Sequence, residues 1–202
     1  GSQDVAVKDI FVPKHRVHHA MDGFRCDSPG NAVNTAALYR IPFQQIFIRA
    51  ITTSALGALR GMLQAFEHYA ENRVSSLGNA TREDPDAQAI CAEILAELDE
   101  MELVLIRNYN ELLEHAQSGE PPPMDRRLLF KYQAAAVPDR CLRLAKRLFQ
   151  CVGGSGIFAT QPFGRYYRDI ITSRQHAAAQ SNVVARSWGG IVLGKENQEW
   201  YL

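Results

Sequence analysis

The sequence predicts an all-α protein, an antiparallel four-helix bundle preceded by a short β and loop segment. From about residue 42 onward, four long segments place apolar residues every three or four positions, the period of one buried helical face. Stretches rich in glycine, proline or polar residues separate these segments. Because each apolar stripe must be buried against a neighbour, an antiparallel bundle with short polar connections is the expected arrangement.

Residues 4–12, "DVAVKDIFV", alternate apolar and polar side chains and stop at Pro13, which predicts one or two short strands. The next stretch, through "DSPGN", carries turn residues without a sustained period, so we expect a connecting loop. A strand pair this short is not stable by itself. It therefore packs on the bundle, or it completes a sheet that is encoded upstream.

The first long helix is expected to begin near Pro42. Gly57 and Gly61 lie inside its pattern, and each should cost up to about 1 kcal/mol relative to alanine. We therefore expect another backbone to approach closely at these two positions. The residues of its apolar stripe are Ile48, Ile51, Ala55, Leu59, Met62, Phe66 and Tyr69.

The second helix is expected to start with Asp84 as N-cap and Pro85 at the first helical position, and to end at "SGEPPP". Its stripe consists of Ile90, Ile94, Leu98, Met101, Leu105 and Leu112. The third pattern runs from Asp125 to Cys151, and Pro138 inside it predicts a kink or a short break. Two glycines, at 153 and 154, end that pattern.

The fourth helical pattern begins at Pro162 and continues to Gly194, with a break expected near His176. Between the third and fourth patterns lies "QCVGGSG", residues 150–156. Glycine permits a positive φ and lets a large ligand approach the backbone amides closely. An ordinary helix C-terminus uses one glycine, and Gly153 alone would supply it. Three glycines therefore indicate more than a helix end.

Composition excludes several classes of partner. Lys plus Arg and Asp plus Glu both number 22, so no excess positive charge favours nucleic acid or an anionic membrane surface. No signal segment opens the sequence, and no uninterrupted apolar run approaches the roughly 20 residues of a membrane span. The 4 cysteines form no CxxC motif, which favours reduced thiols and a cytoplasmic location. The early histidines lack further ligands at suitable spacing, so no metal site is expected.

Several of these segments resemble a known family. The string "QCVGGSG", followed by Pro162, Arg165, Tyr167, Arg168 and Asp169, is similar to the signature of the C-terminal helical domain of the acyl-CoA dehydrogenase superfamily. The stretch "HYAENRVSSLGNATREDPDAQ" is placed like the segment ahead of that domain's second bundle helix, and "VKDIFVPKHRV" looks like the last strand of the family's middle β-domain. The resemblance implies that residues 1–40 end a β-domain with its connecting loop and that residues 41–202 form the helical bundle domain. It covers only the C-terminal half of a usual member, so this chain alone could be an inactive fragment.

The sequence departs from the acyl-CoA dehydrogenases where their catalytic carboxylate is expected. The window "IITSRQHAAAQS", residues 170–181, holds neither Asp nor Glu, and it carries His176 instead. A histidine here resembles the reduced-flavin-dependent monooxygenases of the superfamily, of the p-hydroxyphenylacetate hydroxylase type. Those oxygenases take reduced FMN or FAD from a separate flavin reductase, form a C4a-hydroperoxyflavin with O2 and hydroxylate a small aromatic, usually phenolic, substrate. An acyl-CoA dehydrogenase with a displaced base and a non-catalytic oligomerising helical module remain alternatives.

The resemblance also assigns site residues. His176 would be the catalytic base that makes a phenol phenolate-like, a task that suits imidazole; the alternative is a solvated or structural histidine. Arg73 would bind a flavin phosphate, as guanidinium does well, or it would simply cap the first helix. Ser75 would add a hydroxyl donor to that cofactor site. The glycine turn would meet the flavin across a subunit boundary through Gln150, Gly153 and Gly154, so a homodimer or homotetramer is expected.

Overall fold

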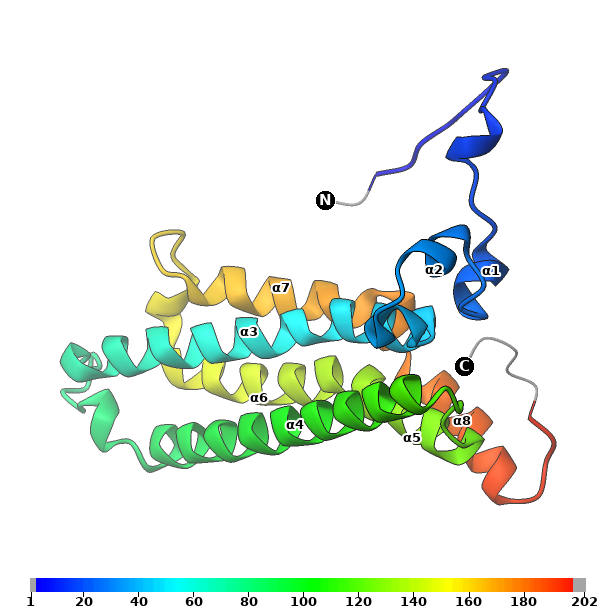
Figure 1. Ribbon diagram of the computed structural model, residues 1–202. Coiled ribbons are helices and arrows are strands. Elements are labelled where there is room, and N and C mark those ends of the chain that lie inside the picture. The colour runs from blue at the N-terminus through cyan, green and yellow to red at the C-terminus, as the bar shows by residue number, and fades with distance from the viewer. Residues whose placement is uncertain (1–2, 198–202) are drawn as a thin grey trace.

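The computed structural model describes residues 3–197, and within that range it is helical without a β-strand. Four antiparallel rods, α3, α4, α6 and α7, lie side by side, and α5 and α8 pack together at one end (Figure 1). This arrangement confirms the predicted all-α bundle. The bounds are α3 Phe43–Asn72, α4 Pro85–Ser118, α5 Met124–Ala135, α6 Val137–Val152, α7 Phe163–Gln175 and α8 Ser181–Val192.

The predicted helix ends are confirmed. Pro42 is the N-cap residue of α3, and the Asp84 carboxylate accepts a hydrogen bond from the Asp86 amide at 2.9 Å at the start of α4. The predicted break near Pro138 separates α5 from α6 at Ala136. Proline lacks an amide donor, and the first turn of α6 requires none from it.

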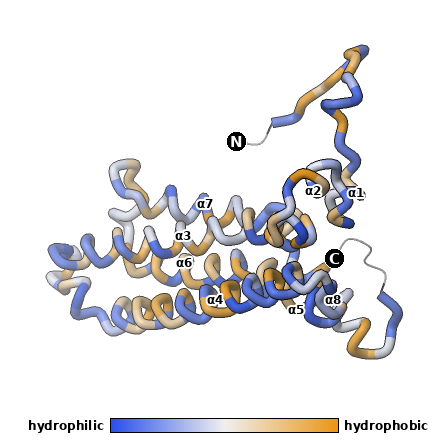
Figure 2. The backbone as a smooth tube through the Cα atoms, viewed as in Figure 1, coloured by the Kyte–Doolittle hydropathy of each residue, from blue (hydrophilic) through white to orange (hydrophobic). Residues whose placement is uncertain are grey.

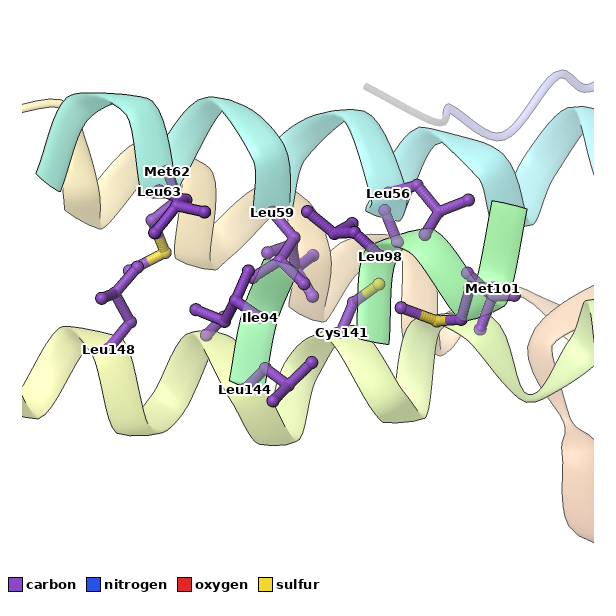
Figure 3. Packing of buried hydrophobic residues seen from close by; sticks show 14 of the residues in the cluster. Leu56, Leu59, Met62, Leu63, Ile94, Leu98, Met101, Cys141, Leu144 and Leu148 are labelled. Atoms are coloured by element: carbon purple, nitrogen blue, oxygen red, sulfur yellow. The ribbon is translucent and has the colours of Figure 1, made fainter. Parts of the chain in front are cut away.

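The core follows the predicted apolar stripes. Side chains of α3, α4 and α6 meet along the bundle axis, as Figure 3 shows for Leu59, Ile94, Cys141 and Leu148. Leu59, Ile94 and Leu148 are each 0% exposed. Burying a side chain of this size contributes about 1.5 to 3 kcal/mol. Burial also raises the pKa of the Cys141 thiol to about 12, so this cysteine behaves as a small apolar residue.

The expectation of close backbone approach at two glycines of α3 is wrong in its detail. A Cβ atom at Gly61 would lie 2.9 Å from the ring of Tyr166 on α7, so a side chain occupies that space rather than a backbone. A Cβ atom at Gly57 would meet no atom within 4 Å. Gly61 therefore admits an aromatic ring between α3 and α7, whereas Gly57 lies on an exposed face.

The strands predicted at residues 4–12 are absent. This stretch carries no ladder and extends away from the bundle (Figure 1), with its apolar residues outside the core (Figure 2). A strand requires a partner for its backbone groups, and the described part of the chain supplies none. Residues 13–40 form two short helices, α1 Ala20–Phe24 and α2 Pro29–Val33, and two 3₁₀ turns, Lys14–Arg16 and Ala37–Arg40. The proposed domain boundary at residue 40 stays a prediction.

One helix, α3, is long and apolar enough to cross a membrane by length and composition alone. Its apolar side chains pack against α5, α6 and α7. Burial inside the bundle accounts for part of this composition, as it does for core helices in general.

Candidate functional site

The turn after α6 requires glycine at two of its positions. Gly153 has φ 73° and ψ −170°, a backbone conformation that is essentially restricted to glycine. At Gly156, which is buried, a Cβ atom would lie 2.2 Å from Cγ1 of Val152. A Cβ atom at Gly153 or at Gly154 would meet no atom within 4 Å. The turn therefore presents open backbone on one side while it closes tightly against α6 on the other.

A hydrogen-bond network joins this turn to the end of α3. The Arg73 Nε donates to the Tyr69 hydroxyl at 2.8 Å. The Tyr69 hydroxyl donates to the Val152 carbonyl at 3.0 Å and lies 2.7 Å from the Ser155 hydroxyl. The structure thus brings the predicted cofactor residues Arg73 and Gly153 to the same end of the bundle, which we call the glycine end.

Two further predicted cofactor residues, Ser75 and Gln150, lie near this end with different roles. Ser75 accepts hydrogen bonds from the amides of Leu77 at 3.3 Å and Asn79 at 3.1 Å, so its hydroxyl stabilises its own loop. Gln150 is exposed on the last turn of α6, where its carbonyl accepts from the Gly153 amide at 3.3 Å. No ligand contact follows from either arrangement, and both assignments stay predictions.

The predicted catalytic residue, His176, lies at the other end of α7. It ends that helix and caps the 3₁₀ turn Ala177–Ala179: its Nδ1 accepts from the Ala178 amide at 3.1 Å. Its ring centroid lies 5.6 Å from that of Phe47 on α3. A neutral imidazole with Nδ1 as acceptor carries its proton on Nε2. In this arrangement His176 offers a hydrogen-bond donor at Nε2, and it can act as a base there only after exchanging tautomers.

Sequence reasoning missed Asp139, which binds both sides of the His176 segment. In the first turn of α6, the Asp139 Oδ1 accepts from the Arg174 Nε. Its other oxygen, Oδ2, accepts from the Ser181 hydroxyl at 2.8 Å. An acidic residue after a proline is also what an ordinary helix start contains, so the sequence offered no signal for this second role. We call the end of the bundle that holds His176 the histidine end.

Aromatic rings line up at the histidine end. Phe47 stacks on Phe43 with centroids 5.4 Å apart, and Phe43 lies 5.9 Å from Phe24. Phe43 also borders a hollow of about 410 Å³ between α3, α4 and residues 18–41, which Tyr39 and Tyr109 help to line. Flat apolar surfaces of this kind suit an aromatic ligand.

Arg49 is a second residue that the sequence did not reveal. This arginine of α3 is only 6% exposed. Its Nη1 donates to the Gln45 carbonyl at 2.5 Å and to the Gln45 Oε1 at 3.1 Å. Its Nε and Nη2 have no hydrogen-bond partner among the described residues. Burial of the guanidinium lowers the pKa of Arg49 to about 10, an effect that Tyr109 partly opposes.

The two ends are separated by the length of α7. This helix has 13 residues, and a rise of 1.5 Å per residue places its ends about 20 Å apart. The structure therefore does not bring His176 together with Arg73 and Gly153 in one compact site within a single chain.

The fold is an antiparallel helical bundle with a glycine turn after α6. The sequence model described as "Acyl-CoA dehydrogenase, C-terminal domain" matches residues 50–181. The chain therefore belongs to this family, as the resemblance predicted.

Among curated proteins, the chain is 28% identical over 180 residues to the "Flavin-dependent monooxygenase, oxygenase subunit HsaA" of Rhodococcus jostii. The matched region covers 88% of this chain and 47% of that protein. It is 26% identical over 210 residues to the "FADH(2)-dependent resorcinol hydroxylase, oxygenase component" of a Rhizobium species, covering 99% of this chain and 51% of that protein. The chain thus spans about half the length of the curated relatives it matches.

A solved structure shows a similar fold. The crystal structure of the 3-HSA hydroxylase from Rhodococcus sp. RHA1 superimposes with a TM-score of 0.85 at 25% identity, covering 97% of this chain and 50% of that one. The similarity extends beyond the bundle to nearly all of the chain.

Proposed function

We propose that this chain is the C-terminal half of the oxygenase component of a two-component monooxygenase, which uses reduced flavin and O2 to hydroxylate a phenolic substrate. The observation that carries this proposal is that a histidine follows α7, where the acyl-CoA dehydrogenases are expected to carry their catalytic carboxylate. His176 stands in a window without any carboxylate, so the proton abstraction of an acyl-CoA dehydrogenase has no base in this segment. Relatives whose names describe flavin-dependent hydroxylases support the same reading.

The glycine end fits the phosphate-bearing part of a flavin. Arg73 supplies a cation whose Nε is already fixed by Tyr69, and guanidinium binds phosphate through several donors. Gly153 and Gly154 leave space for close approach to the backbone. We propose these three residues, with Ser75 and Gln150 beside them, as the cofactor contacts. FMN and FAD share the phosphate that this end would hold.

Reduced flavin supplies the activation of O2 in this chemistry. The chain's own residues orient the acceptor and control its proton. The Ala178 amide fixes the His176 ring, and Nε2 can donate a hydrogen bond to the oxygen of a phenol or phenolate. Stabilising the phenolate form makes the ring more reactive toward an electrophilic oxygen. After tautomer exchange, the same nitrogen can take the phenol proton.

The separation of the two ends supports a homo-oligomer, a dimer or a tetramer. In such an oligomer, the glycine end of one subunit would bind the flavin, and this flavin would react beside the His176 of another subunit. The two ends of a single chain can then lie about 20 Å apart along α7 and still serve one shared site. We also propose a flavin reductase as the partner that delivers the reduced cofactor, and a cytoplasmic location.

The test is single-turnover oxygenation by the full-length protein. FMN and FAD are each reduced chemically without air, bound to the protein, and mixed with O2 and a simple phenol such as resorcinol. We expect hydroxylated product with one of the two flavins in the absence of any reductase. Hydrogen peroxide in place of product across a panel of phenols would contradict the proposal. Reduction of the oxidised flavin by an acyl-CoA thioester would favour the dehydrogenase alternative instead.

A further inference from the structure

We propose that Asp139 is a positioning residue for His176, and that it acts by fixing both flanks of the segment from Arg174 to Ser181. Its consequence for catalysis rests on the proposed function. Its consequence for the His176 ring does not, and the two can be measured separately.

The geometry divides the work between the two carboxylate oxygens. Oδ1 accepts from the Arg174 Nε, in the last turn of α7. Oδ2 accepts from the hydroxyl of Ser181, the first residue of α8, at 2.8 Å. These partners are 35 and 42 residues away in the sequence, and they stand on either side of His176. One side chain of α6 thereby contacts both the last turn of α7 and the first residue of α8.

Charge and burial strengthen both contacts. Asp139 lies in the first turn of its helix and Arg174 in the last turn of its own, where the helix dipoles favour an anion and a cation respectively. Arg174 has a side chain 20% exposed, and Ser181 is 6% exposed. The Asp139 side chain itself is 40% exposed, so the exclusion of water is partial, and these charge-assisted bonds are only moderately stronger than those of a fully exposed pair.

The contacts reach His176 through the backbone between them. Ala178 and Ala179 are 7% and 0% exposed, so this short turn is packed in place. The Ala179 amide donates to the His176 carbonyl at 2.9 Å, and the Ala178 amide donates to Nδ1 at 3.1 Å. The tautomer and the direction of Nε2 therefore depend on the position of a turn that Asp139 holds at both ends.

The first experiment measures the ring itself, without flavin or substrate. Nitrogen-15 NMR at mildly alkaline pH, where imidazole is neutral, should show the Nε2–H tautomer of His176 in the parent. In Asp139→Ala we expect a mixture of tautomers. Asp139→Asn keeps a single acceptor oxygen, so it should lie between the two. Unchanged His176 nitrogen shifts in Asp139→Ala would overturn the proposal.

Two further variants separate positioning from general destabilisation. Glu93→Ala removes another carboxylate that joins α6 to a neighbouring helix, through Arg147, and it should leave the His176 signals unchanged. Ser181→Ala removes one contact and keeps the Asp139–Arg174 pair, so it serves if Asp139→Ala does not fold. Equal shifts of the His176 signals in Glu93→Ala and Asp139→Ala would also overturn the proposal.

The second experiment is a double-mutant cycle on oxygen transfer. Misplacement of a reacting group by about 1 Å can slow a reaction about 100-fold, and we expect a loss of up to that order in Asp139→Ala. In a His176→Asn background the same substitution should cause no further loss, because the two residues act as a unit. Additive losses would overturn the proposal. If no variant oxygenates a phenol while the tautomer still responds to Asp139→Ala, the proposed function fails and the positioning role stands.

Discussion

The glycine end and the histidine end of the bundle are built in different ways. At the glycine end, a backbone conformation and the Tyr69 hydroxyl bring Arg73 and Gly153 together. At the histidine end, His176 owes its orientation to a neighbouring amide and to Asp139 on another helix. The first arrangement is announced by a short sequence motif, whereas the second emerges only from tertiary packing. A family signature therefore locates a site more readily than it locates the residues that orient it.

The largest expected effect is at the histidine end. His176→Asn should slow oxygen transfer by about 10² to 10⁴, the usual share of general acid–base catalysis, while flavin affinity stays near that of the parent. Hydrogen peroxide release should rise correspondingly. Stopped-flow measurement with product quantification checks this. Partial recovery at higher pH with a phenol would assign the base role, and its absence would favour the donor role. A variant as fast as the parent would remove His176 from the mechanism.

The matching substitution at the glycine end should affect binding instead of oxygen transfer. Arg73→Ala should weaken reduced-flavin binding by about 1.5 to 3 kcal/mol if the guanidinium makes a charge-assisted phosphate contact. Equilibrium titration under anaerobic conditions measures the dissociation constant. Arg82→Ala, at an exposed arginine paired with Glu83, is a control from the same loop region. An unchanged dissociation constant in Arg73→Ala would mean that Arg73 only caps α3 and helps to hold the glycine turn in place.

Backbone conformation at the glycine end can be tested with a matched pair. Gly153→Ala should lower the free energy of unfolding by about 1 to 3 kcal/mol, because alanine is strained at this φ and ψ. Gly154→Ala should change it by less than about 0.5 kcal/mol, since the added Cβ meets open space. Urea denaturation of both variants makes the comparison. Similar effects at the two positions would mean that the turn adapts.

Arg49 tests whether a buried arginine at the histidine end lowers the stability of the fold. Arg49→Met should raise the free energy of unfolding by about 1 kcal/mol. Two buried nitrogens without a partner in residues 3–197 cost about 1 to 3 kcal/mol, and the lost bond to Gln45 offsets part of the gain. Arg60→Met, at an exposed arginine paired with Glu102 on the same face of the bundle, is the control. Thermal denaturation measures both. A lower stability of Arg49→Met would show that its cation has a partner in the assembled protein.

The smallest expected effect concerns the ion pair that joins α4 to α5. The hydrogen bond from the Arg126 Nε at 2.7 Å lowers the pKa of Glu111 below its ordinary value. A carboxylate with a lowered folded-state pKa stabilises the fold above its unfolded pKa, and this contribution disappears as the pH falls through the folded pKa. Glu111→Gln should therefore reduce stability at neutral pH by less than about 1 kcal/mol. At pH values below both the folded-state and the unfolded-state pKa of Glu111, the substitution should change stability little. Urea midpoints measured across the acid range check the difference.

Periodicity was sufficient to predict the bundle, because the same residues that repeat every three or four positions are the ones that α3, α4 and α6 bury. The break at Pro138 followed from the chemistry of proline. The strands at residues 4–12 could not be judged in isolation, since pairing depends on a partner. The roles of Asp139 and Arg49 could not be predicted from the sequence for a related reason. A carboxylate in a first helical turn and an arginine in a helix have ordinary local explanations, and only the folded chain shows what each one contacts.

The alternating residues near the N-terminus have a consequence for how this chain behaves in solution. Val5, Val7 and Phe11 are 84%, 64% and 87% exposed, on a stretch without ladder partners within residues 3–197. Extended backbone with apolar side chains and free amide and carbonyl groups is a template for intermolecular pairing. Aggregation of the isolated chain, as distinct from the proposed oligomer, should therefore start at this segment, and a lysine at position 7 or 11 should delay it by setting like charges against each other.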